Sequence, residues 1–313
     1  MLFDIFCCVF RKSLSLLIAK SIFVECTLPN SEHGICKTQY TSDVDYCLKK
    51  DADESIAQII YNNIVEYAIG EFEIDYNNLD EEQLRAIATN LRYDDDASDT
   101  QKLKYGFYGE VLLYSLLINL FSTDVLISKG YFYSPLEKGE PKGYDAYHLV
   151  QHDDNVELWF GEAKFRNDYK KPIEEVIKGF SKTTSGGYFK DNVLAIVKEK
   201  HNISRGHNVI DKISPITESW KKTVEINIEA ELSKNSISLI YPIMITFQQP
   251  KRKDYFEGIK SCVDYIEELF AIGEYIINPS IPIKIFFMFF PVDDVKQIKE
   301  KVIEWISKKE PLI

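Results

Sequence analysis

The sequence lacks several features that would each point to a class of protein. It contains no uninterrupted apolar run of the roughly 20 residues needed to span a bilayer, which argues against an integral membrane protein. It has no phosphate-binding Gly-x-x-x-x-Gly-Lys-Ser/Thr loop, so we do not expect the chain to use ATP itself. It also has no internal repeat and no low-complexity segment, which argues against a repeat array or a wholly disordered chain.

Cysteine is scarce and irregularly spaced. Five of the six cysteines lie before residue 50, without a regular framework or a close Cys-x-x-Cys pair, so reduced thiols and a cytoplasmic location are expected. Cys26, His33, Cys36 and Cys47 form an alternative zinc set without the usual spacing. Charges such as Lys20 interrupt the apolar N-terminus, which favours a packed segment or a partner-binding extension over a signal peptide.

Basic residues are few in the front third of the chain. Residues 1–100 carry 8 Lys and Arg against 19 Asp and Glu, whereas the rest carries 29 against 30. The net charge of -12 is therefore concentrated in the front third, and the remainder is near neutral and able to form a basic surface for nucleic acid. The basic segments 164–182, 198–212 and 251–253 are candidates for such a surface, with solvated faces as the simpler interpretation.

The 313 residues, 45% of them hydrophobic, are enough for a substantial core and for one large domain or two smaller ones. We divide the chain into an N-terminal extension (1–50), an acidic helical region (51–100) and an α/β domain (101–313) with a mixed central sheet flanked by helices. Periodicity predicts helices over 53–69, 80–91, 101–121, 171–182, most of 203–232, 255–272 and 295–308. It predicts strands over 124–133, 192–197, 238–247 and 282–292, with the internal Pro242 favouring an edge strand or a bulge. Pro29, Gly34 and scattered polar residues predict a loop over 29–50.

Residues 143–164 read as two strands joined by a tight turn at Asp153-Asp154. With the turn centred there, Asp145 lies opposite Glu162. Side chains alternate faces along a strand, so Glu162 and Lys164 share one face. Because opposed carboxylates repel each other, this patch predicts a cation between them. A slip of one residue in register would separate Asp145 from Glu162.

Three other residues of the hairpin have simpler interpretations. Gly143 is expected opposite Lys164, where its missing side chain would leave room. His148 and His152 lie near the turn, and we interpret them as surface histidines rather than as ligands of one metal.

Glu110 is the only charge between Lys104 and Asp124, in a helix that is apolar nearly all round. A lone carboxylate on a buried helix must be paired, protonated or bound to a cation. It either pairs with a basic side chain or caps a neighbour, or it contributes to a functional site.

These residues supply what phosphodiester hydrolysis requires. Asp145 and Glu162 are the expected ligands of Mg²⁺, with the Ala163 carbonyl as a third. Lys164 would orient the attacking water or offset charge in the transition state. Glu110 would bind a second ion or hydrogen-bond a metal-bound water. Mn²⁺ is a possible substitute for Mg²⁺.

The order of a helical Glu, then Asp, then Glu-x-Lys on adjoining strands resembles the PD-(D/E)xK nuclease superfamily. Three segments are more closely similar to the HamA family, the nuclease subunits of the Hachiman anti-phage defence system: Tyr-Gly-Phe-Tyr-Gly-Glu110, Gly-Tyr-Asp145 and Phe-Gly-Glu162-Ala-Lys164-Phe. A C-terminal Phe-Phe-Pro-Val adds to this likeness, which covers about residues 100 to 313. Tyr144 stands where the superfamily has its proline.

The resemblance implies a Mg²⁺-dependent deoxyribonuclease with a PD-(D/E)xK, or restriction-endonuclease-like, core. It further implies that the protein acts on DNA together with a superfamily 2-type helicase, HamB, without a membrane. Two alternatives remain open. The fold could be a non-catalytic DNA-sensing or docking subunit of a helicase complex, or a stand-alone restriction-type endonuclease.

Overall fold

The structure is a computed structural model. It describes residues 23–27, 38–41, 52–134, 136, 142–152, 155–199, 228–249, 255–271 and 283–312. The expectations for the first 22 residues, the zinc set, the helix over most of 203–232 and the basic segment 251–253 lie largely or wholly outside these ranges. Among the described helices, none combines the length and apolarity needed to cross a membrane.

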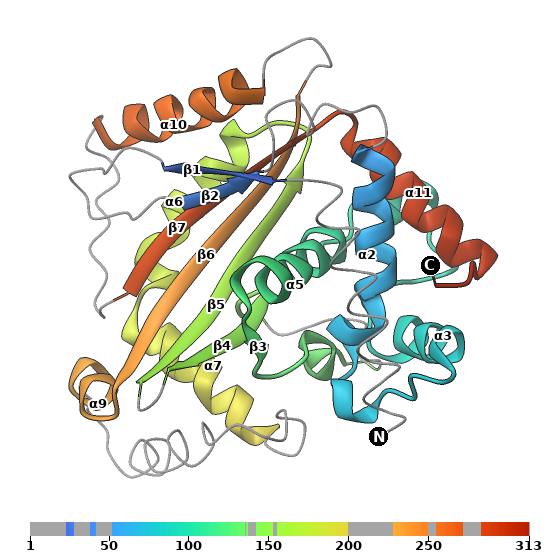
Figure 1. The fold of residues 1–313 in the computed structure, drawn as a ribbon, viewed down its shortest axis with the longest axis horizontal. Coiled ribbons are helices and arrows are strands. Elements are labelled where there is room, and N and C mark those ends of the chain that lie inside the picture. The colour runs from blue at the N-terminus through green and yellow to red at the C-terminus, as the bar shows by residue number, and fades with distance from the viewer. Residues whose placement is uncertain are drawn as a thin grey trace.

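A five-stranded mixed sheet forms the centre of the molecule (Figure 1). Its strands are β3 (Asp124–Val125), β4 (Ala146–His152), β5 (Asn155–Arg166), β6 (Ile237–Gln248) and β7 (Ile283–Val292), in that spatial order. The first three strands pair antiparallel, and β5, β6 and β7 pair parallel. Two further strands, β1 (Phe23–Thr27) and β2 (Thr38–Thr41), form a separate antiparallel pair. The predicted α/β class with a mixed sheet is confirmed.

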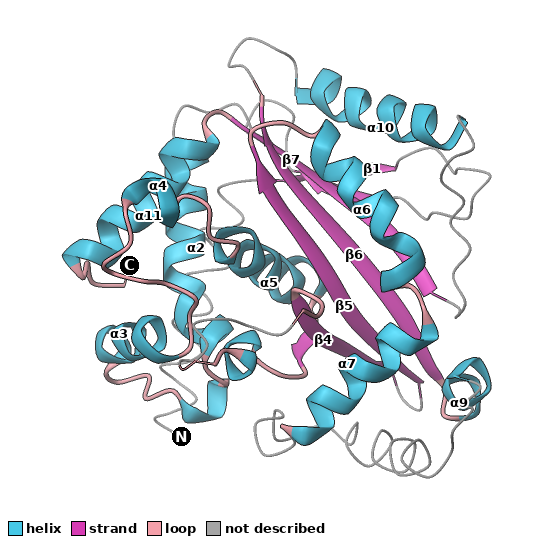
Figure 2. Cartoon of the chain, turned by 180° about the vertical axis from the view of Figure 1, so that it is seen from behind, coloured by secondary structure: helices cyan, strands magenta, loops and turns pink. Residues whose placement is uncertain are grey.

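Helices cover both faces of the sheet (Figures 1 and 2). One face packs against α5 together with α2 and α11, and the other packs against α6, α7 and α10. The bounds are α2 (Ala52–Ala68), α3 (Leu79–Thr89), α4 (Asp99–Lys102), α5 (Phe107–Phe121), α6 (Lys170–Thr183), α7 (Gly186–Lys198), α9 (Ile228–Lys234), α10 (Tyr255–Ala271) and α11 (Val295–Lys308), with 3-10 helices η1 (Glu71–Glu73) and η2 (Lys129–Phe132).

Most predicted helices are confirmed to within a few residues, but three predictions of local structure were wrong. The strand expected over 192–197 is part of helix α7. Its buried residues recur at helical spacing, and the Ser185 side chain caps it by accepting from the Tyr188 N–H at 3.2 Å. The strand expected over 124–133 is only two residues long and leads into η2. The segment expected as a loop over 29–50 contains β2.

Pro242 lies in a central strand, so the expectation of an edge strand or a bulge was wrong. The pairing of β5 with β6 is interrupted between Trp159–Ile240 and Glu162–Ile243, and it resumes without a shift in register. At this gap a Cβ on Gly161 would lie 3.3 Å from both Cγ and the carbonyl oxygen of Pro242. The glycine therefore lets β5 approach a residue that has no N–H to donate.

The helix α2 is part of the main core. Its residues Ile59, Ile60 and Ile64 are completely buried, and it packs against α5 and α11. The Asp53 carboxylate accepts from the backbone N–H groups of Asp293 (3.0 Å) and Asp294 (2.7 Å), which joins the start of α2 to the start of α11. Burial, outweighing these bonds, raises the pKa of Asp53 to about 6.

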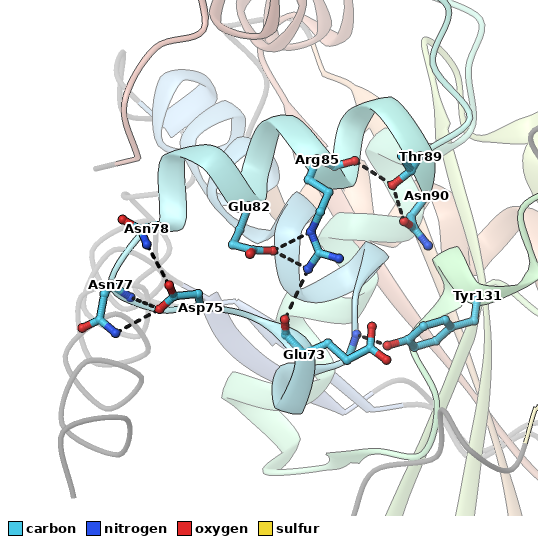
Figure 3. Close-up of polar contacts among 10 residues, drawn as sticks. Glu73, Asp75, Asn77, Asn78, Glu82, Arg85, Thr89, Asn90 and Tyr131 are labelled. Atoms are coloured by element: carbon cyan, nitrogen blue, oxygen red, sulfur yellow. Dashed lines mark hydrogen bonds and ion pairs between the residues drawn. The ribbon is translucent and has the colours of Figure 1, made fainter.

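Polar contacts hold α3 and η2 against the end of α2 (Figure 3). The Arg85 guanidinium bonds the Glu82 carboxylate and donates to the Glu73 carbonyl at 3.2 Å. The Gly70 N–H donates to the Tyr131 hydroxyl at 2.9 Å. Next to Tyr131, a Cβ on Gly130 would lie 2.3 Å from the Ala68 carbonyl oxygen, so η2 can approach α2 this closely only with glycine there.

Candidate active site

The hairpin has the predicted register. Strands β4 and β5 pair from His152–Asn155 to Ala146–Gly161, so the predicted turn position is confirmed although the turn residues 153–154 lie outside the described part of the chain. Asp145 lies one residue beyond this ladder.

Asp145 continues the hydrogen bonding between the two strands beyond the end of the β4–β5 ladder. The Asp145 N–H donates to the Gly161 carbonyl at 2.8 Å, and Oδ2 of Asp145 accepts from the Ala163 N–H at 2.8 Å. The aspartate carboxylate thus accepts from a backbone N–H of β5 that lies beyond the β4–β5 ladder. This bond holds the charge of Asp145 next to the backbone of Glu162.

Glu162 and Lys164 share a face of β5, as predicted, and form an ion pair. The distance from Lys164 Nζ to Glu162 Oε1 is 2.5 Å, and the two side chains are 20% and 18% exposed. The Tyr241 hydroxyl lies 3.5 Å from Glu162 Oε2. The structure therefore brings Asp145, Glu162 and Lys164 together at one place.

The negative charges of Asp145 and Glu162 repel each other in this group. Burial, followed by the charge of Asp145, raises the pKa of Glu162 to about 7 against the opposing effect of Lys164. Burial acts to lower the pKa of Lys164, but the charges of Glu162 and Asp145 outweigh it and raise that pKa. Hard oxygen donors in a half-buried, mutually repelling pair fit a divalent cation, whose charge would relieve the repulsion.

Aromatic rings form a wall behind the acid pair. The ring of Tyr144 packs against Tyr188 and Tyr241 at centroid distances of 5.0 and 5.7 Å. Its hydroxyl donates to the Thr183 carbonyl at 2.6 Å, which attaches the segment before Asp145 to the end of α6. All three tyrosines lie within electrostatic range of Glu162, so their rings contribute to the apolar side of this group.

The room left by Gly143 has a different use from the one predicted. A Cβ there would lie 2.4 Å from the Tyr147 hydroxyl and 2.8 Å from Asn192 Oδ1. Tyr147 donates to that same Asn192 oxygen at 2.7 Å. The glycine therefore makes space for a polar contact between β4 and α7 rather than for Lys164. A single sequence could not show this, because Asn192 is distant along the chain.

Lys129 is a site residue that the sequence interpretation missed. It lies on η2, is 5% exposed, and donates from Nζ to the Tyr144 carbonyl at 2.5 Å. Its charge acts to lower the pKa of Glu162, so the two side chains are electrostatically coupled. A signal was present in the sequence, since Lys129 is the only charge in the stretch from residue 125 to 133.

Glu110 is held apart from this group. Its Oε2 accepts from the Tyr67 hydroxyl at 2.5 Å. Helix α5 packs on the face of β5 that carries Ala163, because a Cβ on Gly109 would lie 3.4 Å from Ala163 Cβ. Glu162 and Lys164 point to the other face. Within the described ranges, no three His, Cys, Asp or Glu side chains gather closely enough to hold a metal ion.

The histidines of the hairpin have no evident role in chemistry. His148 is buried, so the expectation of a surface histidine was wrong for it. Its Nδ1 lies 2.8 Å from the Thr123 hydroxyl, and its ring packs edge-on against Tyr114. Burial lowers its pKa to about 3, so it is neutral at physiological pH and acts as part of the core. The side chain of His152 lies outside the described part.

Comparison with known proteins gave one match. A model of the family described as HamA matches residues 21–306. The match begins well before residue 100, so it includes the acidic helical region that the motif resemblance left out. Searches of curated proteins and of solved structures returned no match.

Proposed function

This chain belongs to the HamA family of Hachiman anti-phage defence, and from that premise we propose that it is a Mg²⁺-dependent DNA nuclease. The observation that supports this most is the group formed by Asp145, Glu162 and Lys164 at the open end of the hairpin. Two half-buried carboxylates that repel each other, with a lysine on the same face, suit metal-assisted phosphodiester hydrolysis better than a structural ion pair.

We assign Asp145, Glu162 and the Ala163 carbonyl as the ligands of one Mg²⁺, with Mn²⁺ as a substitute. When bound, the ion would polarise a phosphate oxygen and lower the pKa of a bound water. Glu162 lies partly buried beside Asp145, and a bound cation would offset the repulsion between the two carboxylates.

Two lysines complete the proposed site. Lys164 remains charged beside Glu162, and it would orient the attacking water or offset charge on the phosphate in the transition state. Glu110 is not among the residues assigned to the Mg²⁺ ion, because α5 places it on the other face of β5 with its carboxylate bonded to the Tyr67 hydroxyl; its role in binding a second ion or a metal-bound water stays a prediction. Lys129 would favour the ionised form of Glu162, since its charge, together with that of Lys164, opposes the effect of burial.

We further propose that the fold is a PD-(D/E)xK core and that the protein works with a superfamily 2-type helicase. The chain order supports the first point, because α5 precedes the hairpin β4–β5, which α6 and the parallel strand β6 follow in a mixed sheet. Membership of the HamA family supports the second point. A partner with ATPase activity would supply what this chain lacks, a phosphate-binding loop.

A plasmid-nicking assay with Mg²⁺ tests the nuclease proposal. Glu162→Gln, Lys164→Ala and Asp145→Asn should each lower cleavage by about 100-fold or more. The matched control is Glu174→Gln with Lys178→Ala, a Glu–Lys pair on α6 at 3.2 Å that is much more exposed, and it should cleave like the wild type.

Two results would overturn the nuclease proposal. One is equal cleavage by the wild type and all three site variants. The other is no cleavage by the wild type even with the helicase and ATP present, which would favour the alternative of a DNA-sensing or docking subunit. Cleavage restricted to one short sequence, without any partner, would instead favour a stand-alone restriction-type endonuclease.

A further inference from the structure

A polar cavity opens beside Lys164. It has a volume of about 560 Å³ and lies where β5 ends and where α6 and α11 begin. The strands β5, β6 and β7 are parallel and end on this side of the sheet. The carboxyl ends of parallel strands are where α/β proteins commonly bind ligands.

The lining of this cavity is strongly basic for a chain of net charge -12. Five cations line it, namely Lys104, Arg166, Lys171, Lys296 and Lys299. Only two acids, Asp168 and Glu175, oppose them. The five cations come from three separate parts of the chain, so no single helical face explains why they gather.

Three of these cations, Lys104, Arg166 and Lys171, make no ion pair with an acidic side chain in the described part of the chain. Asp168 accepts from the backbone N–H of Lys171 at 3.1 Å. Exposed lysines elsewhere do pair with an acid on their own helix, as in Lys260–Asp264 and Lys308–Glu304. The cavity therefore carries three positive charges that no ion pair among the described residues neutralises.

Lys299 adds a buried charge beneath the exposed ones. It is 6% exposed, and its Nζ donates to the carbonyls of Leu103 (3.1 Å) and Phe165 (3.3 Å). Burial, followed by the charge of Arg166, lowers the pKa of Lys299 to about 8. An anion in the cavity would be attracted to both groups and would relieve the repulsion between them.

The cavity lies next to the candidate active site. Arg166 follows Lys164 by two residues, a distance of about 7 Å along a strand. Glu175, which lines the cavity, contributes to raising the pKa of Lys164, so the two sites share an electrostatic environment.

We propose that this cavity binds the phosphate groups of the DNA strand on one side of the bond to be cleaved, through Lys104, Arg166 and Lys171. This inference rests on the proposed nuclease function for its substrate. It places a sequence-independent contact beside the metal ligands, so that the strand is positioned by its backbone and not by its bases.

Binding of fluorescent oligonucleotides to the full chain in EDTA tests this without cleavage. Lys104→Gln, Arg166→Gln and Lys171→Gln combined should weaken binding about tenfold or more at 0.1 M salt, with a salt slope shallower by about 0.7 per lost contact to a single strand. The control combines Lys260→Gln with Lys308→Gln, two exposed and paired lysines, and should bind like the wild type. All three cavity residues are exposed, so thermal melting should show both proteins folded.

Oligonucleotides with a 5′-phosphate and with a 5′-hydroxyl distinguish the two sources of the phosphate. Equal weakening for both assigns the cavity to internal backbone phosphates, whereas weakening only for the phosphorylated strand assigns it to a terminal phosphate. Unchanged affinity and an unchanged salt slope in the folded triple variant would overturn the proposal. Because no metal is present, this result is independent of the outcome of the nicking assay.

Discussion

The ammonium of Lys129 donates to the Tyr144 carbonyl at 2.5 Å, which joins η2 to the residue that immediately precedes Asp145. The lysine is in turn positioned by α2, since Gly130 packs against the Ala68 carbonyl and the Ser128 hydroxyl donates to the Glu66 carbonyl at 3.2 Å. Through these contacts the acidic helical region helps to position the candidate active site, which lies in another part of the sequence.

Replacement of Lys129 should therefore alter the site without unfolding the protein. Lys129→Met should lower Mg²⁺-dependent cleavage by about tenfold or more and should shift the pH at which cleavage is half-maximal upward, because Glu162 would lose a nearby positive charge. Lys129→Arg keeps the positive charge, so its half-maximal pH should lie close to that of the wild type. An unchanged pH profile in Lys129→Met would show that this lysine only supports the backbone of Tyr144.

Stability in the absence of metal should depend on the ionisation of Glu162. The folded-state pKa is about 7 against an ordinary value of 4.5, so the stabilisation from protonated Glu162 is fully present below pH 4.5 and is lost as pH rises to about 7. The loss should be roughly 2–3 kcal/mol. Urea unfolding in EDTA at pH 4.5 and 8 measures it against Glu162→Gln. Asp53 titrates in both proteins and cancels in the difference. Identical pH dependence in the two proteins would contradict the raised pKa.

Addition of Mg²⁺ should reverse this loss of stability. Since the ion binds ionised carboxylates, the increase in melting temperature on adding Mg²⁺ should grow from pH 5.5 to pH 8. Asp145→Asn should abolish the increase, whereas Asp264→Asn, which changes an exposed acid of α10, should leave it intact. An equal increase in Asp145→Asn would mean that Mg²⁺ binds elsewhere.

Gly130 and Gly179 offer a direct test of how η2 is positioned. Gly130→Ala should destabilise the protein by at least about 2 kcal/mol, because its Cβ would lie 2.3 Å from the Ala68 carbonyl oxygen. Gly179→Ala, in the middle of α6 with nothing within 4 Å of the new Cβ, should instead stabilise it by about 0.5–1 kcal/mol. Chemical denaturation measures both. Equal effects of the two substitutions would argue against the close contact between η2 and α2.

The role of Glu110 can be tested through its partner Tyr67. If Glu110 acts in catalysis, Tyr67→Phe should reduce cleavage together with Glu110→Gln, because the hydroxyl holds the carboxylate in place. Tyr76→Phe removes a similar buried hydroxyl from the Glu66 carboxylate at 2.7 Å and should affect stability by about 1 kcal/mol without affecting cleavage. If Glu110→Gln also leaves cleavage unchanged, Glu110 has a structural role only.

The hairpin could be predicted from sequence because its information is local. Turn residues at 153–154 and the two-residue alternation of a strand are enough to place Asp145, Glu162 and Lys164 near one another. The prediction failed where the neighbours are distant in sequence. Pro242 lies in a central strand with Gly161 of β5 close beside it, and α7 looked like a strand because its apolar residues are consecutive as well as periodic.

The sequence by itself determined the α/β class, the hairpin register, and the acid pair with its lysine, since periodicity and turn chemistry depend on adjacent residues. Only the tertiary structure decided that Lys129 joins the pair and that Glu110 is bonded to Tyr67 on the other face of the sheet. It also decided that three separate segments form the basic cavity beyond Lys164. These outcomes depend on which helices cover each face of the sheet, and that is set by the packing of side chains far apart in the chain.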